Sequence, residues 1–126
     1  MIQRWTSLPR LRWAFWLCLV VVLTLSLMPP RVPMPTTGWD KANHALAFAV
    51  LAVLGLRSYP GRVYGLLLGL LAYGGAIELL QALTPYRTAD FRDLLADGVG
   101  LLLGWQLARV FAHVRQARAK GADGRR

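Results

Sequence analysis

The chain has 126 residues, of which 56% are hydrophobic, and it carries a formal net charge of +9. This length allows one domain, and the high apolar fraction, with a mean hydropathy of +0.40, excludes an ordinary soluble domain and indicates a membrane protein. The charge does not indicate a nucleic-acid-binding protein, because the basic residues flank apolar runs instead of forming one stripe.

Four apolar runs follow one another along the chain, roughly at residues 13–28, 42–56, 63–83 and 94–112. Basic residues precede the first run, as in a secretory signal, but Leu27-Met28-Pro29-Pro30 offers no small-residue cleavage site, so we expect a retained span. The second run covers only about 22 Å as a helix, short of the roughly 30 Å hydrocarbon core. To span, it must draw Asp40, Lys41 and His44 toward membrane depth, which requires that they face protein or water.

These runs predict an all-α, polytopic membrane protein with four transmembrane helices in a compact bundle. Residues 1–12 form a basic N-terminal segment, residues 13–112 the membrane domain, and residues 113–126 a basic tail. Eleven of the Lys and Arg residues lie in the two termini and the second loop, against four in the first and third loops. The positive-inside rule therefore places both termini in the cytoplasm and the first and third loops outside.

Polar residues within or beside the apolar runs fall into three groups. They are Asp40, Lys41 and His44 at the start of the second run, Glu78 and Gln81 at the end of the third, and Arg87, Asp90, Asp93 and Asp97 at the start of the fourth. In the predicted orientation all three groups lie at the outer membrane level. Helical spacing also places Asp40 with His44, Glu78 with Gln81, and Asp90 with Asp93 and Asp97 on one face of their helices. The sequence therefore predicts one outward-facing polar site built from three spans.

The same residues carry a resemblance to a known family. Asp-Lys-x-x-His-x-x-x-Phe from Asp40, Glu-x-x-Gln from Glu78, and Asp-x-x-x-Asp-x-x-Gly-x-x-x-Gly from Asp93 resemble the VanZ-like family of small bacterial membrane proteins, over residues 40–104. The resemblance implies a multi-pass protein of the bacterial inner (plasma) membrane. The founding member is associated with reduced susceptibility to teicoplanin, a lipid-tailed glycopeptide, so the resemblance also implies an effect on the cell envelope or on low-level susceptibility to such antibiotics. In many members Asn stands where this chain has Asp97, which argues against an essential charge there.

Three interpretations of the predicted polar site stay open. It can bind a lipid-linked envelope precursor or a lipoglycopeptide, with Arg87 engaging an anionic group such as pyrophosphate. It can belong to an intramembrane enzyme acting on a lipid or lipid-linked substrate, with His44 and Glu78 as acid and base, although no nucleophile is evident and an enzyme is the less favoured interpretation. It can also be structural, holding three helices together through polar contacts.

No cofactor is predicted, because the chain has no dense ligand motif such as His-Glu-x-x-His. The alternative is a divalent cation such as zinc or manganese, with His44, Glu78, Asp93 and Asp97 as its candidate ligands. An ion or proton conductor is the weakest hypothesis, since the inner halves of the runs contain almost no ionisable residues.

Small residues recur every fourth position in the last two runs. They are Gly65 and Gly69 in the third run, and Ala96, Gly100 and Gly104 in the fourth. Such spacing removes side-chain bulk along one helix face and predicts close packing between helices of the same chain. The expected partners are membrane lipids, with anionic lipid at the basic termini, and no nucleic acid.

Overall fold

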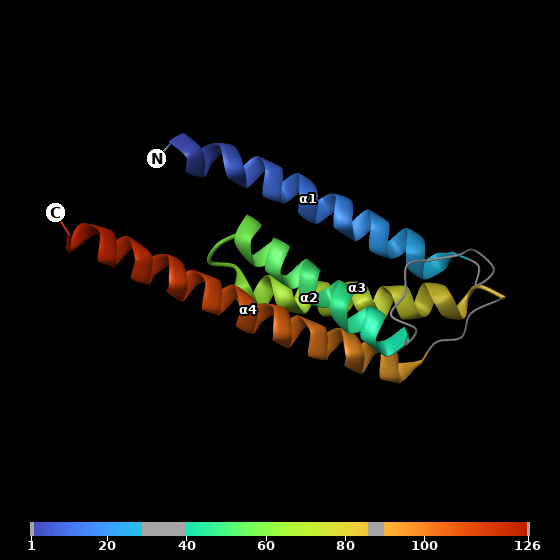
Figure 1. Cartoon of the computed structure of the whole chain (residues 1–126). Helices are drawn as coiled ribbons and strands as arrows, with labels where there is room; N and C mark the ends of the chain where they lie inside the picture. The colour runs from blue at the N-terminus through green and yellow to red at the C-terminus, as the bar shows by residue number, and fades with distance from the viewer. Residues whose placement is uncertain (1, 29–39, 86–89, 126) are drawn as a thin grey trace.

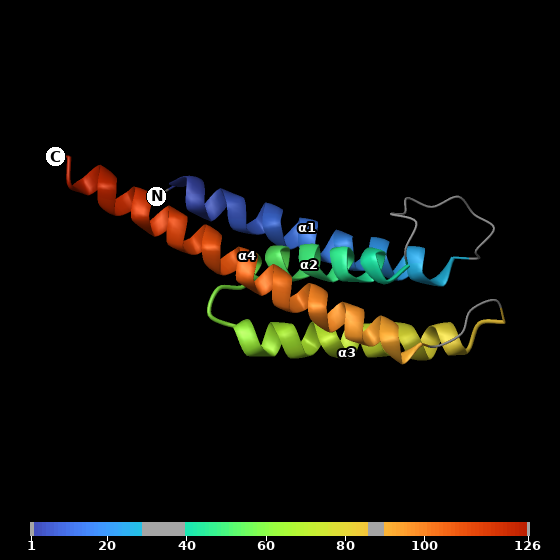
Figure 2. The ribbon, with the colours of Figure 1, turned by 60° about the horizontal axis from the view of Figure 1, so that its bottom comes forward.

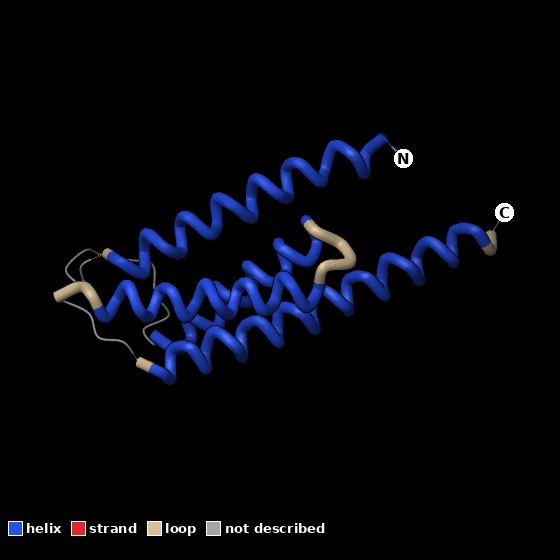
Figure 3. The backbone as a smooth tube through the Cα atoms, turned by 180° about the vertical axis from the view of Figure 1, so that it is seen from behind, coloured by secondary structure: helices blue, strands red, loops and turns tan. Residues whose placement is uncertain are grey.

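The structure, a computed structural model, describes residues 2–28, 40–85 and 90–125 of the chain. These residues form four α-helices and no strand (Figure 3). The helices are α1 (Ile2–Leu27), α2 (Asp40–Ser58), α3 (Val63–Ala82) and α4 (Phe91–Asp123). The predicted all-α fold is therefore confirmed for the described part of the chain.

Consecutive helices run in opposite directions, and α2 lies among the other three (Figure 1). Its most extensive contact is with α4, whereas α1 and α4 do not touch each other in the described ranges. The C-terminal ends of α1 and α3 and the N-terminal ends of α2 and α4 lie together at one end of the bundle (Figure 1). We call this end, defined by Leu27, Asp40, Ala82 and Phe91, the polar end.

Two helices extend beyond the apolar runs from which they were predicted. α1 begins at Ile2 and contains Pro9, so the basic N-terminal segment is helical. α4 has 33 residues, about 50 Å at the helical rise, and continues through the basic residues to Asp123. Ala, Arg, Gln and Lys favour helix there, and no proline intervenes. The end of α4 projects past the other helices (Figure 2), and its side chains from 111 to 125 are exposed.

Length and composition identify three helical segments that can cross a membrane: Leu8–Leu27, Val63–Ala82 and Phe91–Asp123. α2 is not one of them, because it carries Lys41, Asn43 and His44 in its first turns and Arg57 in its last. Its 19 residues provide sufficient length, about 28 Å, but not the hydropathy. The structure therefore supports a membrane protein with three apolar candidate spans and a fourth, more polar helix packed among them.

Large apolar side chains cover the outside of the bundle. Leu68, Leu79, Leu83, Leu102 and Val110 are all exposed. A soluble monomer rarely exposes apolar surface on this scale, because contiguous apolar patches promote aggregation in water. The exposed surface of α3 and α4 is instead what a helix presents to lipid tails.

The buried core lies where α2 meets its neighbours. It consists of Phe15, Phe48, Leu51, Ala52, Leu70, Ile77 and Leu101. Three of these residues belong to α2, which agrees with the central position of that helix. The core continues directly into the polar end, because Phe48 lies one turn after His44 on α2.

Glycines allow α2 and α4 to approach closely. A Cβ at Gly100 would overlap the carbonyl oxygen of Ala45, and one at Gly104 would meet the side chain of Ala52 at 2.6 Å. Ala96, one turn earlier on α4, is half-buried. On α3, the glycines expected to pack closely against another helix do not do so. A Cβ at Gly65 or Gly69 would meet nothing within 4 Å.

The packing face of α3 lies elsewhere on the helix. Its buried residues are Leu70, Gly74, Ile77, Glu78 and Gln81. This spacing of three and four residues defines a stripe that does not include Gly65 or Gly69. The small-residue pattern alone did not reveal which face of α3 meets its neighbours.

Candidate functional site

Titratable side chains from three helices meet at the polar end. His44 comes from α2, Glu78 from α3, and Asp93 from α4. One nitrogen or oxygen atom from each lies within 4.8 Å of the corresponding atoms of the other two. We define the polar cluster as these residues together with Lys41, Asp90 and Asp97.

A buried carboxylate holds the imidazole of His44. His44 Nδ1 and Asp97 Oδ1 form a hydrogen bond of 2.9 Å, and Asp97 is only 1% exposed. With Asp97 ionised, the carboxylate can only accept, and Nδ1 carries a ring proton. The other ring nitrogen, Nε2, then lies 3.7 Å from Asp93 Oδ2. Asp97 therefore orients His44 and leaves Nε2 available on the side of Asp93.

Lys41 connects two acidic residues at the rim of the polar cluster. Its Nζ lies 3.5 Å from Asp90 Oδ2 and 3.7 Å from Asp93 Oδ1. Asp90 is the N-cap of α4, and its Oδ1 accepts a 2.9 Å hydrogen bond from the backbone N–H of Arg92. This backbone hydrogen bond, with the Lys41 charge acting in the same direction, lowers the pKa of Asp90 below its ordinary value. Asp90 is therefore ionised at neutral pH.

Glu78 is buried, being 8% exposed, and only one of its oxygens is bonded. Glu78 Oε2 accepts the backbone N–H of Asp90 at 2.9 Å, which ties α3 to the start of α4. Glu78 Oε1 is buried without a hydrogen-bond partner among the described residues. Buried polar atoms are nearly always bonded, so an unbonded carboxylate oxygen is an unusual feature that needs a physical reason.

Gln81 belongs to the contact between α3 and α1. Its Nε2 donates to the carbonyl oxygen of Ser26 at 2.9 Å, and its Oε1 is a second buried acceptor without a partner in the described part of the chain. Two other members of the predicted site cannot be placed. Arg87 lies outside the described residues, and so does the side chain of Asp40, although its backbone begins α2.

The sequence matches a known family. A family model described as VanZ/LLP1 matches residues 7–112, which is most of the chain. The chain belongs to the VanZ/LLP1 family. The match begins in α1 and includes the membrane-length part of α4, so it extends beyond the motif region 40–104. No curated protein and no solved structure matches the chain.

One residue that shapes the polar cluster of this VanZ/LLP1 protein contributes no functional group. A Cβ at Gly74 would lie 2.6 Å from Asp97 Oδ2 and 3.2 Å from Phe48. Only the missing side chain at Gly74 lets the Asp97 carboxylate lie against α3. The sequence gives a weak signal for this role, since Gly74 stands one turn before Glu78.

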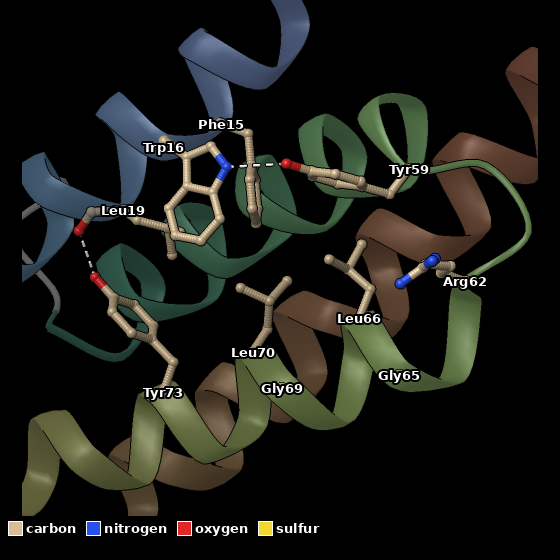
Figure 4. Close-up of a pocket in the computed structure, with 10 residues that line it drawn as sticks. All are labelled: Phe15, Trp16, Leu19, Tyr59, Arg62, Gly65, Leu66, Gly69, Leu70 and Tyr73. Carbon is tan, nitrogen blue, oxygen red and sulfur yellow. Dashed lines mark hydrogen bonds between the residues drawn. The ribbon is translucent and has the colours of Figure 1, made fainter. Parts of the chain in front are cut away.

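A second concave feature of this VanZ/LLP1 protein is an apolar groove between α1 and α3 (Figure 4). It has a volume of about 470 Å³, and its walls include Phe15, Leu66 and Leu70. Two hydrogen bonds join residues that line the groove. Trp16 Nε1 donates to Tyr59 Oη at 3.0 Å, and Tyr73 Oη donates to the carbonyl oxygen of Leu19. The groove contains no acid–base pair. The chemistry of the described residues is therefore concentrated in the polar cluster.

Proposed function

We propose that this VanZ/LLP1-family protein binds the polar part of a lipid-linked envelope molecule at the outer face of the bacterial inner (plasma) membrane. In this role it lowers susceptibility to teicoplanin-type lipoglycopeptides, which act at the same surface. The proposal includes four spans, with α2 as the fourth, and cytoplasmic termini. The excess of Lys and Arg at the termini and in the loop between α2 and α3 supports that orientation.

The position of α2 supports its role as a span despite its polar first turns. A polar side chain at membrane depth is tolerated where it faces protein, and α2 contacts all three other helices. Lys41 pairs with Asp90 and Asp93, and His44 bonds to Asp97. Two of the polar groups that lower the hydropathy of α2, those of Lys41 and His44, thus have partners on α4 or at its N-cap.

The unbonded oxygen of Glu78 is the observation that carries the proposal. If the polar cluster served only to hold helices together, its buried acceptors would be satisfied within the protein. Instead Glu78 Oε1 is buried without a partner among the described residues. An unused acceptor on a residue within 4.8 Å of an imidazole is typical of a binding site, because a ligand can complete its hydrogen bond.

A second candidate function is acid–base catalysis on a lipid or lipid-linked substrate. The 2.9 Å bond between His44 Nδ1 and Asp97 Oδ1 favours it, because a base fixed by a third group is the usual arrangement in acid–base sites. Ser26, Ser58 and Thr84 each donate to a backbone carbonyl oxygen of α1, α2 or α3. A water molecule activated by His44 would therefore be the attacking group.

The proposed function is tested by teicoplanin susceptibility. A susceptible bacterium that produces the wild-type protein should tolerate several-fold more teicoplanin than the same strain with an empty vector. A glycopeptide without a lipid tail should show a smaller difference. His44→Ala and Glu78→Gln should each abolish the effect, and the double variant should lose no more than the worse single variant if the two residues act as a unit.

His113→Gln provides the matched control, since it removes the only other histidine of the chain, which lies far from the polar cluster on the exposed part of α4. It should behave as wild type. Membrane levels of each variant are compared by immunoblot. If well-produced wild-type protein leaves the tolerated teicoplanin concentration unchanged, the proposed function is wrong.

A further inference from the structure

The polar cluster contains more negative than positive charge. Its carboxylates are those of Glu78, Asp90, Asp93 and Asp97, and the only permanent cation among its members is Lys41. With its four carboxylates ionised and His44 neutral, the cluster would carry a net charge of −3 in a partly buried setting, and Arg92 beside Asp90 offsets part of it. Carboxylates so close together need a proton or a metal ion to offset their repulsion.

The orientation of His44 points to a cation beside it. Asp97 lies at Nδ1, and the second ring nitrogen, Nε2, faces Asp93 Oδ2 at 3.7 Å. Either a proton on Nε2 or a metal ion between the two atoms makes this approach favourable. The distance is close to the roughly 3.3–3.6 Å that separates two ligands of a tetrahedral ion with bonds of about 2.0–2.2 Å.

Glu78 supplies an independent observation. The residue is more than nine-tenths buried, and its Oε1 has no hydrogen-bond partner among the described residues. The same residue contributes a ligand-type atom within 4.8 Å of those of His44 and Asp93. A shift of about 1 Å, within the reach of a carboxylate rotamer change, brings this spread to the ligand spacing of a bound ion.

We propose that His44 Nε2, one oxygen of Glu78 and Asp93 Oδ2 bind a single divalent transition-metal ion, Zn²⁺ or Mn²⁺. One imidazole with two carboxylates suits these ions better than it suits Mg²⁺ or Ca²⁺, which prefer all-oxygen sites. The site goes beyond the proposed function, because binding of the ion does not depend on any effect on antibiotics.

The neighbouring residues support the three ligands. Asp97 acts behind His44 as the outer carboxylate that fixes the tautomer of a metal-binding histidine. Lys41 contacts Asp93 Oδ1 and leaves Oδ2 free for the ion. Three protein ligands leave at least one coordination position open, where water or a phosphate oxygen of a lipid head group can bind.

The test uses tag-free protein purified in mild detergent and treated with a chelator. Zn²⁺ and Mn²⁺ are then titrated by calorimetry, and bound metal is counted by mass spectrometry after dialysis. We expect one ion per chain for the wild-type protein and a rise in its melting temperature with Zn²⁺, since a ligand of the folded state stabilises it. Glu78→Gln and Asp93→Asn should each lower the affinity at least 100-fold.

His113→Gln and Asp123→Asn are the matched controls, because they remove a histidine and a carboxylate from the exposed part of α4. Both should bind one ion with wild-type affinity. The proposal is overturned if the wild-type protein binds no stoichiometric ion and gains no stability from Zn²⁺ or Mn²⁺. It is also overturned if folded Glu78→Gln and Asp93→Asn proteins bind as tightly as wild type.

The metal-binding measurement and the teicoplanin-susceptibility measurement test the two proposals independently. A protein that binds Zn²⁺ but leaves teicoplanin susceptibility unchanged refutes the proposed function and leaves the metal site in place. A protein that lowers susceptibility but binds neither ion refutes the metal site alone.

Discussion

Replacing Gly100 with alanine should destabilise the folded protein by about 1–3 kcal/mol, the usual cost of forcing an extra group into a packed contact. The added Cβ would overlap the carbonyl oxygen of Ala45, which is backbone and cannot rotate away. α2 and α4 would have to separate, and theirs is the most extensive helix contact in the bundle. We expect a melting temperature several degrees below that of the wild-type protein in the same detergent.

Gly98→Ala is the matched control on the same helix. A Cβ at Gly98 meets nothing within 4 Å, so this variant should melt at or slightly above the wild-type temperature. Equal melting temperatures for the two variants would show that α2 and α4 do not pack through Gly100.

The second large effect is expected at Asp97, where alanine and asparagine should behave differently. Asp97→Ala leaves the Nδ1–H of His44 without its acceptor and opens a cavity beside Gly74 and Phe48. The lost hydrogen bond alone should cost about 1–2 kcal/mol, as estimated for interhelical hydrogen bonds in membranes. His44 also loses its fixed orientation, so the effect on teicoplanin susceptibility should disappear.

Asp97→Asn keeps the size of the side chain and an oxygen that can accept from His44. It should retain most of the stability and most of the susceptibility effect. Melting temperature and the tolerated teicoplanin concentration are measured for both variants at matched protein levels. If Asn is as damaging as Ala, the charge of Asp97 is needed and the orienting role is insufficient. If Ala is harmless, Asp97 does not orient His44.

Much of the architecture could be predicted because apolar runs mark helices that face lipid. The all-helical fold and the family followed from the sequence, and α2, α3 and α4 begin within three residues of the predicted runs. The helix ends were harder to predict. α4 continues to Asp123 because helix propensity persists after the apolar pattern stops. Hydropathy alone does not describe α2 well, since Lys41 and His44 in its polar first turns contact carboxylates of α4 or its N-cap.

Helix periodicity and the predicted topology together placed the polar groups of three helices at one membrane level, but they could not assign which side chains contact each other. Partner choice depends on how each helix is rotated about its own axis relative to the others. The sequence did not indicate that Asp97 bonds to His44 while Asp93 faces its other nitrogen. It also did not show that Gln81 donates to Ser26 of α1. The rotation of α3 also explains why Gly65 and Gly69 do not make the predicted close helix contact. The buried face of α3 contains other residues.

The central claim, that the polar end of the bundle faces outward, is tested most directly by labelling single cysteines in intact cells. With Cys18 replaced by alanine, Pro85→Cys marks the polar end and Ala122→Cys marks the far end of α4; both positions are exposed. A membrane-impermeant maleimide should label the Pro85→Cys protein in intact cells and the Ala122→Cys protein only after permeabilisation. The reverse pattern would place the polar cluster at the cytoplasmic face and contradict the account.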